Sequence, residues 1–270
     1  MMLISLLLGL FIGVVLALTG AGGGILAVPL LVFGTSIRVA QAGPIGLMAV
    51  GMASALGTVL GLRAGVVRYR AALLVGAVGM LLSPAGLWLA HHLDNRWLGV
   101  LFAVTLLYVA RNTWRKARDT MAGRTPVRTA APVCVRDAGS GRFIWTRPCA
   151  RALMLSGGVA GFLSGLLGVG GGFVMVPALQ RYTDLTMQSV VATSLAVITL
   201  VSAAGVVSSA ASGVLVWPIA LPFSGGALAG MLGGRLLSKR LSGPNLQVAF
   251  AALSALVAVG MLGKAVFAGP

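Results

Sequence analysis

The sequence carries one unusual apolar string twice, TGAGGGILAVPLL at residues 19–31 and LGVGGGFVMVPAL at residues 167–179. Both copies share the pattern GxGGGxxxVP. Three successive glycines weaken a helix, by about 1 kcal/mol each relative to alanine. The following proline removes a backbone donor and pushes the residue before it toward extended geometry. Each copy therefore predicts a break or a re-entrant turn.

The rest of the chain keeps the register of these two copies. A shift of 148 residues (168 − 20) aligns the halves without a gap, and glycines coincide in pairs such as Gly9 with Gly157 and Gly57 with Gly205. This register indicates a duplication, and internal repeats are the usual construction of secondary transporters. A duplicated scaffold that transports nothing is the alternative.

The composition restricts the class of protein. Of 270 residues, 58% are apolar and 9% are charged, and the mean hydropathy is +1.01. So few charges cannot cover a water-facing surface, which excludes a soluble enzyme, a disordered chain and a disulfide scaffold. The apolar stretches are continuous rather than alternating, so helices are expected and not a barrel.

Charge-free stretches predict an all-α polytopic membrane protein with about eight transmembrane helices in two repeats of four, each with a Gly-rich broken or re-entrant segment. Residues 1–113 would form the first repeat, 114–150 a basic loop and 151–270 the second repeat. Because the pattern of residues 1–18 recurs in mid-chain, we interpret it as a span rather than a signal peptide. The predicted helices are 3–19, 39–62, 69–90, 96–113, 151–167, 187–210, 215–237 and 245–267.

The charge balance is strongly basic, with 20 Lys+Arg against 4 Asp+Glu. Ten of the cations lie between Arg111 and Arg151, which is typical of a cytoplasmic loop of a membrane protein and not of nucleic-acid binding. We expect this loop to contact anionic lipid. A cytosolic location would keep both cysteines, Cys134 and Cys149, reduced.

Two orientations of the repeats are open. Four crossings per half would make the repeats parallel, whereas one further crossing by each glycine segment would invert them. The cations favour the parallel orientation, although it leaves Lys239 and Arg240 on the outer side, against the positive-inside rule.

Unwound backbone at membrane depth is tolerated only where it is buried in protein or lines a cavity. Its N–H groups, with a helix N-terminus, form an anion site, and two copies would converge on one centre. Close helix packing is the alternative role of the glycines. The candidate substrate-binding positions are Gly20, Gly22, Gly23, Gly24 and Pro29 in the first copy and Gly168, Gly170, Gly171, Gly172 and Pro177 in the second.

Polar side chains in the helix after each string add neutral donors. They are Gln41 in the first half, and Gln188, Ser189, Thr193 and Ser194 in the second. The alternative for the hydroxyls is a bond to their own backbone.

The sequence offers no chemistry for an enzyme. It contains two histidines, no CxxC spacing and no HExxH, Walker A or GxSxG pattern, so we expect no metal, no cofactor and no catalytic residues. No acidic residue lies in the centre of a predicted helix. A coupled proton would therefore travel on the substrate or use Asp184, His91 or His92.

The doubled GxGGGxxxVP string, the helix count and the basic central loop resemble the TauE/SafE family of sulfite and organosulfonate exporters, over roughly residues 5–263. The resemblance implies a multi-pass inner-membrane secondary transporter of sulfite, organosulfonates or related sulfur-containing or carboxylate anions. We expect alternating access around the central site, with an anion channel as the alternative and a partner-binding scaffold as a third class. The expected partners are a small anionic substrate and membrane lipid, and a homo-oligomer is open.

Overall fold

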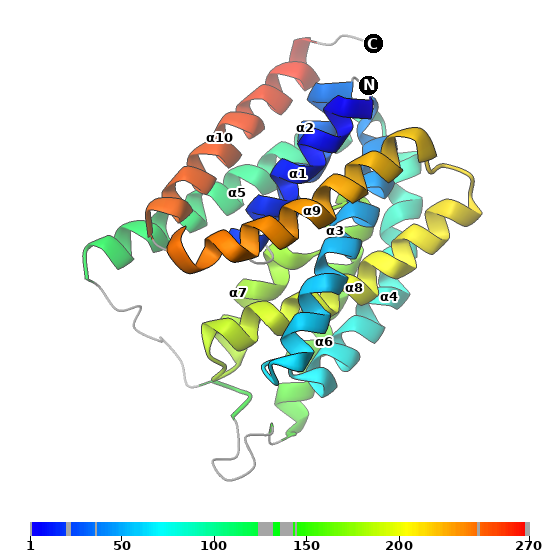
Figure 1. The fold of residues 1–270 in the computed structure, drawn as a ribbon. Helices are drawn as coiled ribbons and strands as arrows, with labels where there is room; N and C mark the ends of the chain where they lie inside the picture. The colour runs from blue at the N-terminus through cyan, green and yellow to red at the C-terminus, as the bar shows by residue number, and fades with distance from the viewer. Residues whose placement is uncertain are drawn as a thin grey trace.

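The computed structural model describes residues 2–19, 23–35, 37–123, 132–135, 143, 145–241 and 244–267, and these residues are almost entirely helical. The prediction of an all-helical chain is confirmed for them (Figure 1). The helices are α1 (Met2–Thr19), the short 3₁₀ helix η1 (Gly23–Leu26), α2 (Ala27–Thr35), α3 (Val39–Arg63), α4 (Tyr69–His92), α5 (Asn95–Met121), α6 (Arg147–Leu167), α7 (Gly172–Tyr182), α8 (Met187–Ala211), α9 (Trp217–Leu241) and α10 (Pro244–Phe267).

Among the described residues, six helices are long and apolar enough to cross a membrane: α1, α3, α4, α6, α8 and the Leu246–Lys264 part of α10. The protein is therefore a multi-pass membrane protein. The other two predicted spans, 96–113 and 215–237, fall on α5 and α9.

Three helix boundaries differ from the prediction by four residues or more, and one of them is the end of α9 at Leu241 rather than 237. Helix α5 continues to Met121 rather than ending at 113, because charged residues do not stop a helix; the left-handed Gly123 (φ 65°) follows it. Helix α6 begins at Arg147 rather than 151. The Thr146 side chain caps its first turn by accepting a hydrogen bond from the Cys149 N–H.

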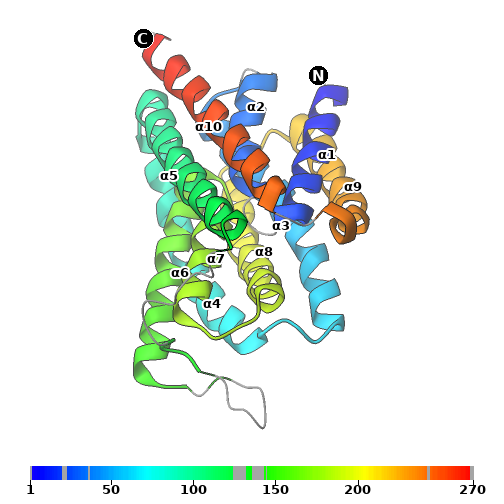
Figure 2. The same cartoon turned by 90° about the vertical axis from the view of Figure 1, so that its left-hand side faces the viewer.

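Both glycine segments interrupt a helix and turn the chain back. Helix α1 ends at Thr19 and packs against α2, and α6 ends at Leu167 and packs against α7. Helices α1 and α2 lie at the end of the molecule that holds both termini, whereas α6 begins at the opposite end (Figure 2). The two helical hairpins, α1–α2 and α6–α7, therefore enter from opposite ends.

Helices α3 and α8, which the 148-residue shift makes equivalent, cross in antiparallel directions. The glycines show this direction, because the atoms nearest to a Cβ added to a glycine belong to the helix that packs against it. Gly51 faces Ser202, Gly57 faces Leu195, Gly61 faces Ala192 and Gly205 faces Leu47, so numbers rise along α3 as they fall along α8. The parallel orientation favoured by the cation count is wrong for this structure. Each hairpin returns to its own end, and three long helices follow it.

The halves also exchange partners. Helix α1 packs on α9 and α6 packs on α4, each pair running in the same direction (Figure 1). The contacts repeat by the same shift: Gly9 lies against the Phe223 backbone, and Gly157 against the Val75 backbone. Here glycines let two helix backbones approach closely, as expected for small residues between membrane helices.

Candidate functional site

The two glycine segments meet beside the crossing of α3 and α8. A Cβ on Gly24 would lie 2.9 Å from the Val169 carbonyl oxygen and 3.1 Å from Cγ1 of Val50. A Cβ on Gly170 would lie 3.1 Å from the same Val50 atom and 2.8 Å from Cγ2 of Ile198. The segments thus converge on one place, although Gly20 and Gly22 lie outside the described residues.

The second segment is built from left-handed backbone. Gly168, Gly170 and Gly171 have φ values of 69°, 78° and 71°, which L side chains rarely adopt. The Gly171 carbonyl accepts hydrogen bonds from the N–H groups of Val174 and Met175, both at 3.1 Å, and this starts α7 at the buried Gly172.

The prolines do not break the chain as expected. Pro29 lies in the first turn of α2 and Pro177 lies inside α7. In a first turn the missing N–H would have no partner within the helix anyway, so proline is tolerated there. The breaks lie at the glycines alone.

The predicted polar residues lie near helix ends or bond locally. Gln41 is exposed, and its Oε1 accepts a hydrogen bond from the Arg38 N–H at 3.4 Å, which caps α3. Gln188 is exposed, and the Ser189 N–H donates to Thr186 Oγ1 at 3.4 Å to cap α8.

The two remaining hydroxyls are buried. Thr193 Oγ1 accepts from the Arg68 N–H at 3.1 Å, and the Ser194 hydroxyl donates to the Val191 carbonyl at 2.9 Å. Ser194 thus bonds its own backbone, which is the alternative role that sequence analysis left open. Thr193 does not, because its partner is the start of α4, 125 residues away in the sequence.

Sequence analysis missed two serines on the crossing helices, and one of them, Ser202, lies beside a glycine segment. Ser54 on α3 and Ser202 on α8 are fully buried, and neither Oγ atom has a hydrogen-bond partner. Ser202 Oγ lies 3.3 Å from the position of a Cβ on Gly170. A buried polar group without a partner costs about 1–3 kcal/mol. The repeat alignment was the available signal, because 54 + 148 = 202 makes these serines equivalent.

Two threonine hydroxyls lie close together where α3 and α8 cross. Thr58 Oγ1 on α3 and Thr199 Oγ1 on α8 lie 3.3 Å apart. Each hydroxyl also has a carbonyl of its own helix within reach as an alternative acceptor for its single hydrogen. The elements at this crossing are themselves uncharged, since neither glycine segment, nor α8, nor residues 39–62 of α3 contain an acidic or basic residue. Any anion here would be held by neutral donors.

Many of the described cations lie at or near helix ends. On the side of the termini these are Arg38, Arg96 and Lys264, and on the opposite side Arg63, Arg68, Arg70, Arg147, Arg151, Arg181 and Arg235. Four more, Arg111, Arg115, Lys116 and Arg118, lie in the second half of α5. Within the described ranges, no group of three or more His, Cys, Asp or Glu side chains could hold a metal ion.

The expectation of reduced cysteines is wrong in this structure, where Cys134 and Cys149 form a disulfide with a Cα–Cα distance of 5.0 Å. The Cys134 N–H donates to the Tyr182 carbonyl at 2.9 Å, and the Asp184 N–H donates to the Cys134 carbonyl at 3.3 Å. This pairing holds Cys134 against the end of α7, beside the start of α6. Sequence separation alone did not reveal the approach.

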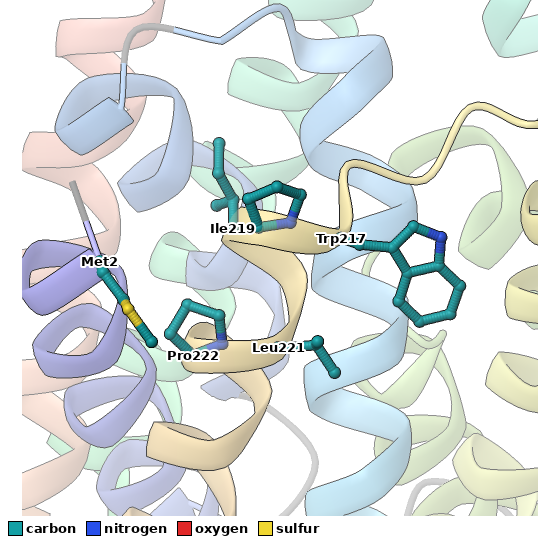
Figure 3. A pocket seen from close by; sticks show the side chains of 6 residues that line it. Met2, Trp217, Ile219, Leu221 and Pro222 are labelled. Carbon is teal, nitrogen blue, oxygen red and sulfur yellow. The ribbon is translucent and has the colours of Figure 1, made fainter.

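An apolar groove of about 490 Å³ lies where α1 and α9 begin (Figure 3). Its lining includes Met2, Trp217 and Pro222 and no residue of either glycine segment. Because Met2 and Trp217 are exposed on the apolar outer surface, this groove is suited to lipid rather than to an anion.

Comparison with known proteins agrees with these features. The family model described as sulfite exporter TauE/SafE matches residues 5–261. A Bacillus subtilis protein named probable membrane transporter protein YunE is 28% identical over 254 residues, covering 88% of this chain and 89% of the relative. A Xylella fastidiosa probable membrane transporter protein is 28% identical over 236 residues, covering 87% of this chain and 84% of the relative.

No solved structure matches the chain. The family match spans almost the whole sequence, including both glycine segments and all the helices that surround them. The chain therefore belongs to the sulfite exporter TauE/SafE family of membrane transporters.

Proposed function

We propose that the protein is a secondary transporter of small anions, with sulfite, organosulfonates or related sulfur-containing or carboxylate compounds as substrates. One observation carries the proposal: Gly24 and Gly170, from equivalent segments, lie against the same Val50 side chain beside the α3–α8 crossing. Interrupted helices that meet between repeats are where transporters bind substrate.

The architecture that fits this function is a pair of inverted repeats, each a helical hairpin followed by three crossings. An odd number of crossings per repeat makes equivalent helices antiparallel, as α3 and α8 are. In this arrangement α9 ends on the side opposite the termini, which we call the cation-rich end. Lys239 and Arg240, near the end of α9, then agree with the positive-inside rule. The cation-rich end, with loop 114–150, would face the cytoplasm of an inner-membrane protein.

Alternating access follows from the two opposed hairpins. Movement of α1–α2 would open the centre to one face, and movement of α6–α7 would open it to the other. Because Val50 and Ile198 pack beside Gly170, such a movement has to separate side chains that are now in contact. An inside-negative potential favours export of an anion by about 2.3 kcal/mol per charge per 100 mV.

Counterflow in proteoliposomes tests the transport class. Vesicles loaded with unlabelled sulfite should accumulate radiolabelled sulfite transiently and saturably. A current that rises linearly with voltage, without counterflow, would support an anion channel with the same site. Neither signal with any small anion would contradict transport and support the scaffold class.

Site-directed labelling tests the orientation. In a Cys134→Ser, Cys149→Ser background, we expect Ser212→Cys to react with an impermeant maleimide from outside and Lys239→Cys from inside. Parallel repeats would reverse both sides, so one experiment separates the two arrangements.

A further inference from the structure

We infer that the Ser54 and Ser202 hydroxyls bind the substrate, and that this neutral pair of donors selects singly charged oxyanions, of the sulfonate or hydrogensulfite type, over doubly charged ones. The inference rests on the proposed transport function and adds the binding residues and the charge class of the substrate.

The hydrogen bonding of the two serines is the first argument. Ser209 shows what a buried serine in α8 ordinarily does, since its hydroxyl donates to the Gly205 carbonyl at 2.7 Å. Six buried serines among the described residues have no partner for the hydroxyl: Ser54, Ser83, Ser164, Ser202, Ser224 and Ser254. Within this set, Ser54 and Ser202 are the pair that the 148-residue shift relates. An unpaired buried hydroxyl is unfavourable unless another group satisfies it, and both halves of the molecule carry one at the equivalent position.

The position of the pair is the second argument. Ser202 lies beside Gly170 of the second glycine segment and opposite Gly51, one helical turn before Ser54 on α3. One donor therefore comes from each repeat, on the two helices that cross at the centre. A ligand with several equivalent oxygens, such as a sulfonate, is suited to donors that come from two neighbouring helices.

The absence of charge is the third argument. Residues 39–62 of α3, the whole of α8 and both glycine segments carry no Lys, Arg or His. No cation there offsets the cost of desolvating an anion, and that cost grows with the square of the charge, about fourfold from one charge to two. Hydroxyl and backbone donors can replace the water around a single charge far more readily than around two.

Alanine variants test the binding residues. In methanesulfonate counterflow, Ser54→Ala and Ser202→Ala should each raise the half-saturation concentration about tenfold, as expected for loss of a hydrogen bond to a charged group. The melting temperature of the ligand-free protein should stay level or rise, since an unpartnered buried hydroxyl is removed. Ser209→Ala is the matched control and should change half-saturation little.

The outcomes distinguish a failure of the transport function from a failure of the serine assignment. If wild-type protein gives no counterflow of any anion, the transport function fails. If wild type transports and both variants keep its half-saturation, or lose it only together with thermal stability, the serines are structural and the inference is overturned.

A competition series tests the charge class. Methanesulfonate should inhibit counterflow at least about tenfold more strongly than sulfate, given the desolvation difference. Sulfite should lose potency as the pH rises from mildly acidic to mildly alkaline and its second proton leaves, whereas methanesulfonate should not. Sulfate that competes as strongly as methanesulfonate would overturn the selection of single charges.

Discussion

The two glycine segments have nearly the same sequence and different backbones. The second uses left-handed conformations at Gly168, Gly170 and Gly171 before α7 begins. In the described part of the first, Gly23 and Gly24 form a 3₁₀ turn that runs directly into α2, and neither has a positive φ. A shared motif thus determines that the helix breaks, but it does not determine one backbone form for the break.

Equivalent glycines of the two copies both lie against the helix that precedes their segment. A Cβ on Gly23 would lie 2.6 Å from the Leu16 nitrogen, so this copy is packed against the helix that precedes it. In the second copy a Cβ on Gly171 would lie 2.6 Å from the Ala160 carbonyl oxygen, and Gly168 lies against Gly43 of the other repeat.

The open ends of the hairpins are also held differently. The second is held by the Cys134–Cys149 disulfide, with Cys134 bonded to the end of α7. Beyond the first, the Val39 N–H donates to Asn95 Oδ1 at 2.9 Å, and Lys264 Nζ donates to the Val32 carbonyl at 3.3 Å. One hairpin is held by a covalent bond and the other by polar contacts.

The largest effect should come from glycine substitution at the breaks. Gly171→Ala adds left-handed strain of about 1–2 kcal/mol and a backbone clash, and should abolish transport. Gly23→Ala adds only the clash, so it should be the milder variant. Counterflow and thermal unfolding of both variants measure the difference.

Gly225→Ala on α9 provides the control, because nothing lies within 4 Å of its added Cβ. It should transport normally and gain up to about 1 kcal/mol of helix stability. Normal transport by Gly171→Ala and Gly23→Ala would show that both glycine segments only pack helices.

Opening the disulfide should have the next largest effect, and only on the second hairpin. The cysteines are 15 residues apart in sequence, and a crosslink over such a loop contributes about 3 kcal/mol. Cys134→Ser should lower the melting temperature accordingly. The crosslink lies at the end that we propose to face the reducing cytoplasm. A reductant should therefore lower the melting temperature of the wild type to that of the variant. An unchanged melting temperature in the variant would show that the hydrogen bonds of Cys134 hold the hairpin without the crosslink.

Helix capping should give the smallest effect. Thr146→Ala removes the side-chain acceptor at the start of α6, and Asn95→Ala removes the acceptor for the Val39 N–H. Each should cost about 1 kcal/mol, as typical cap losses do. Denaturant titrations of both variants measure the loss of unfolding free energy in each half. Losses that differ by more than about 1 kcal/mol would contradict an equal dependence on the two caps.

Much of the fold followed from local sequence. Continuous apolar stretches predicted the helices, and the glycines of residues 20–24 and 168–172 marked the breaks. The site was predicted in part. The convergence of both segments is observed, but Gln41, Gln188 and Ser189 lie at helix starts, because polar residues near a boundary cap helices. The division into residues 1–113, 114–150 and 151–270, the lipid contacts and the oligomeric state stay predictions.

The sequence by itself determined that the chain is helical, apolar enough for a membrane and built from two similar halves, because composition and residue spacing are local properties. Only the tertiary structure decided that α3 and α8 run in opposite directions, that Cys134 reaches Cys149, and that Ser54 and Ser202 lack partners. The crossing and the unpartnered serines depend on contacts between helices more than a hundred residues apart, and the disulfide depends on where the end of α7 holds Cys134. No local pattern encodes such contacts.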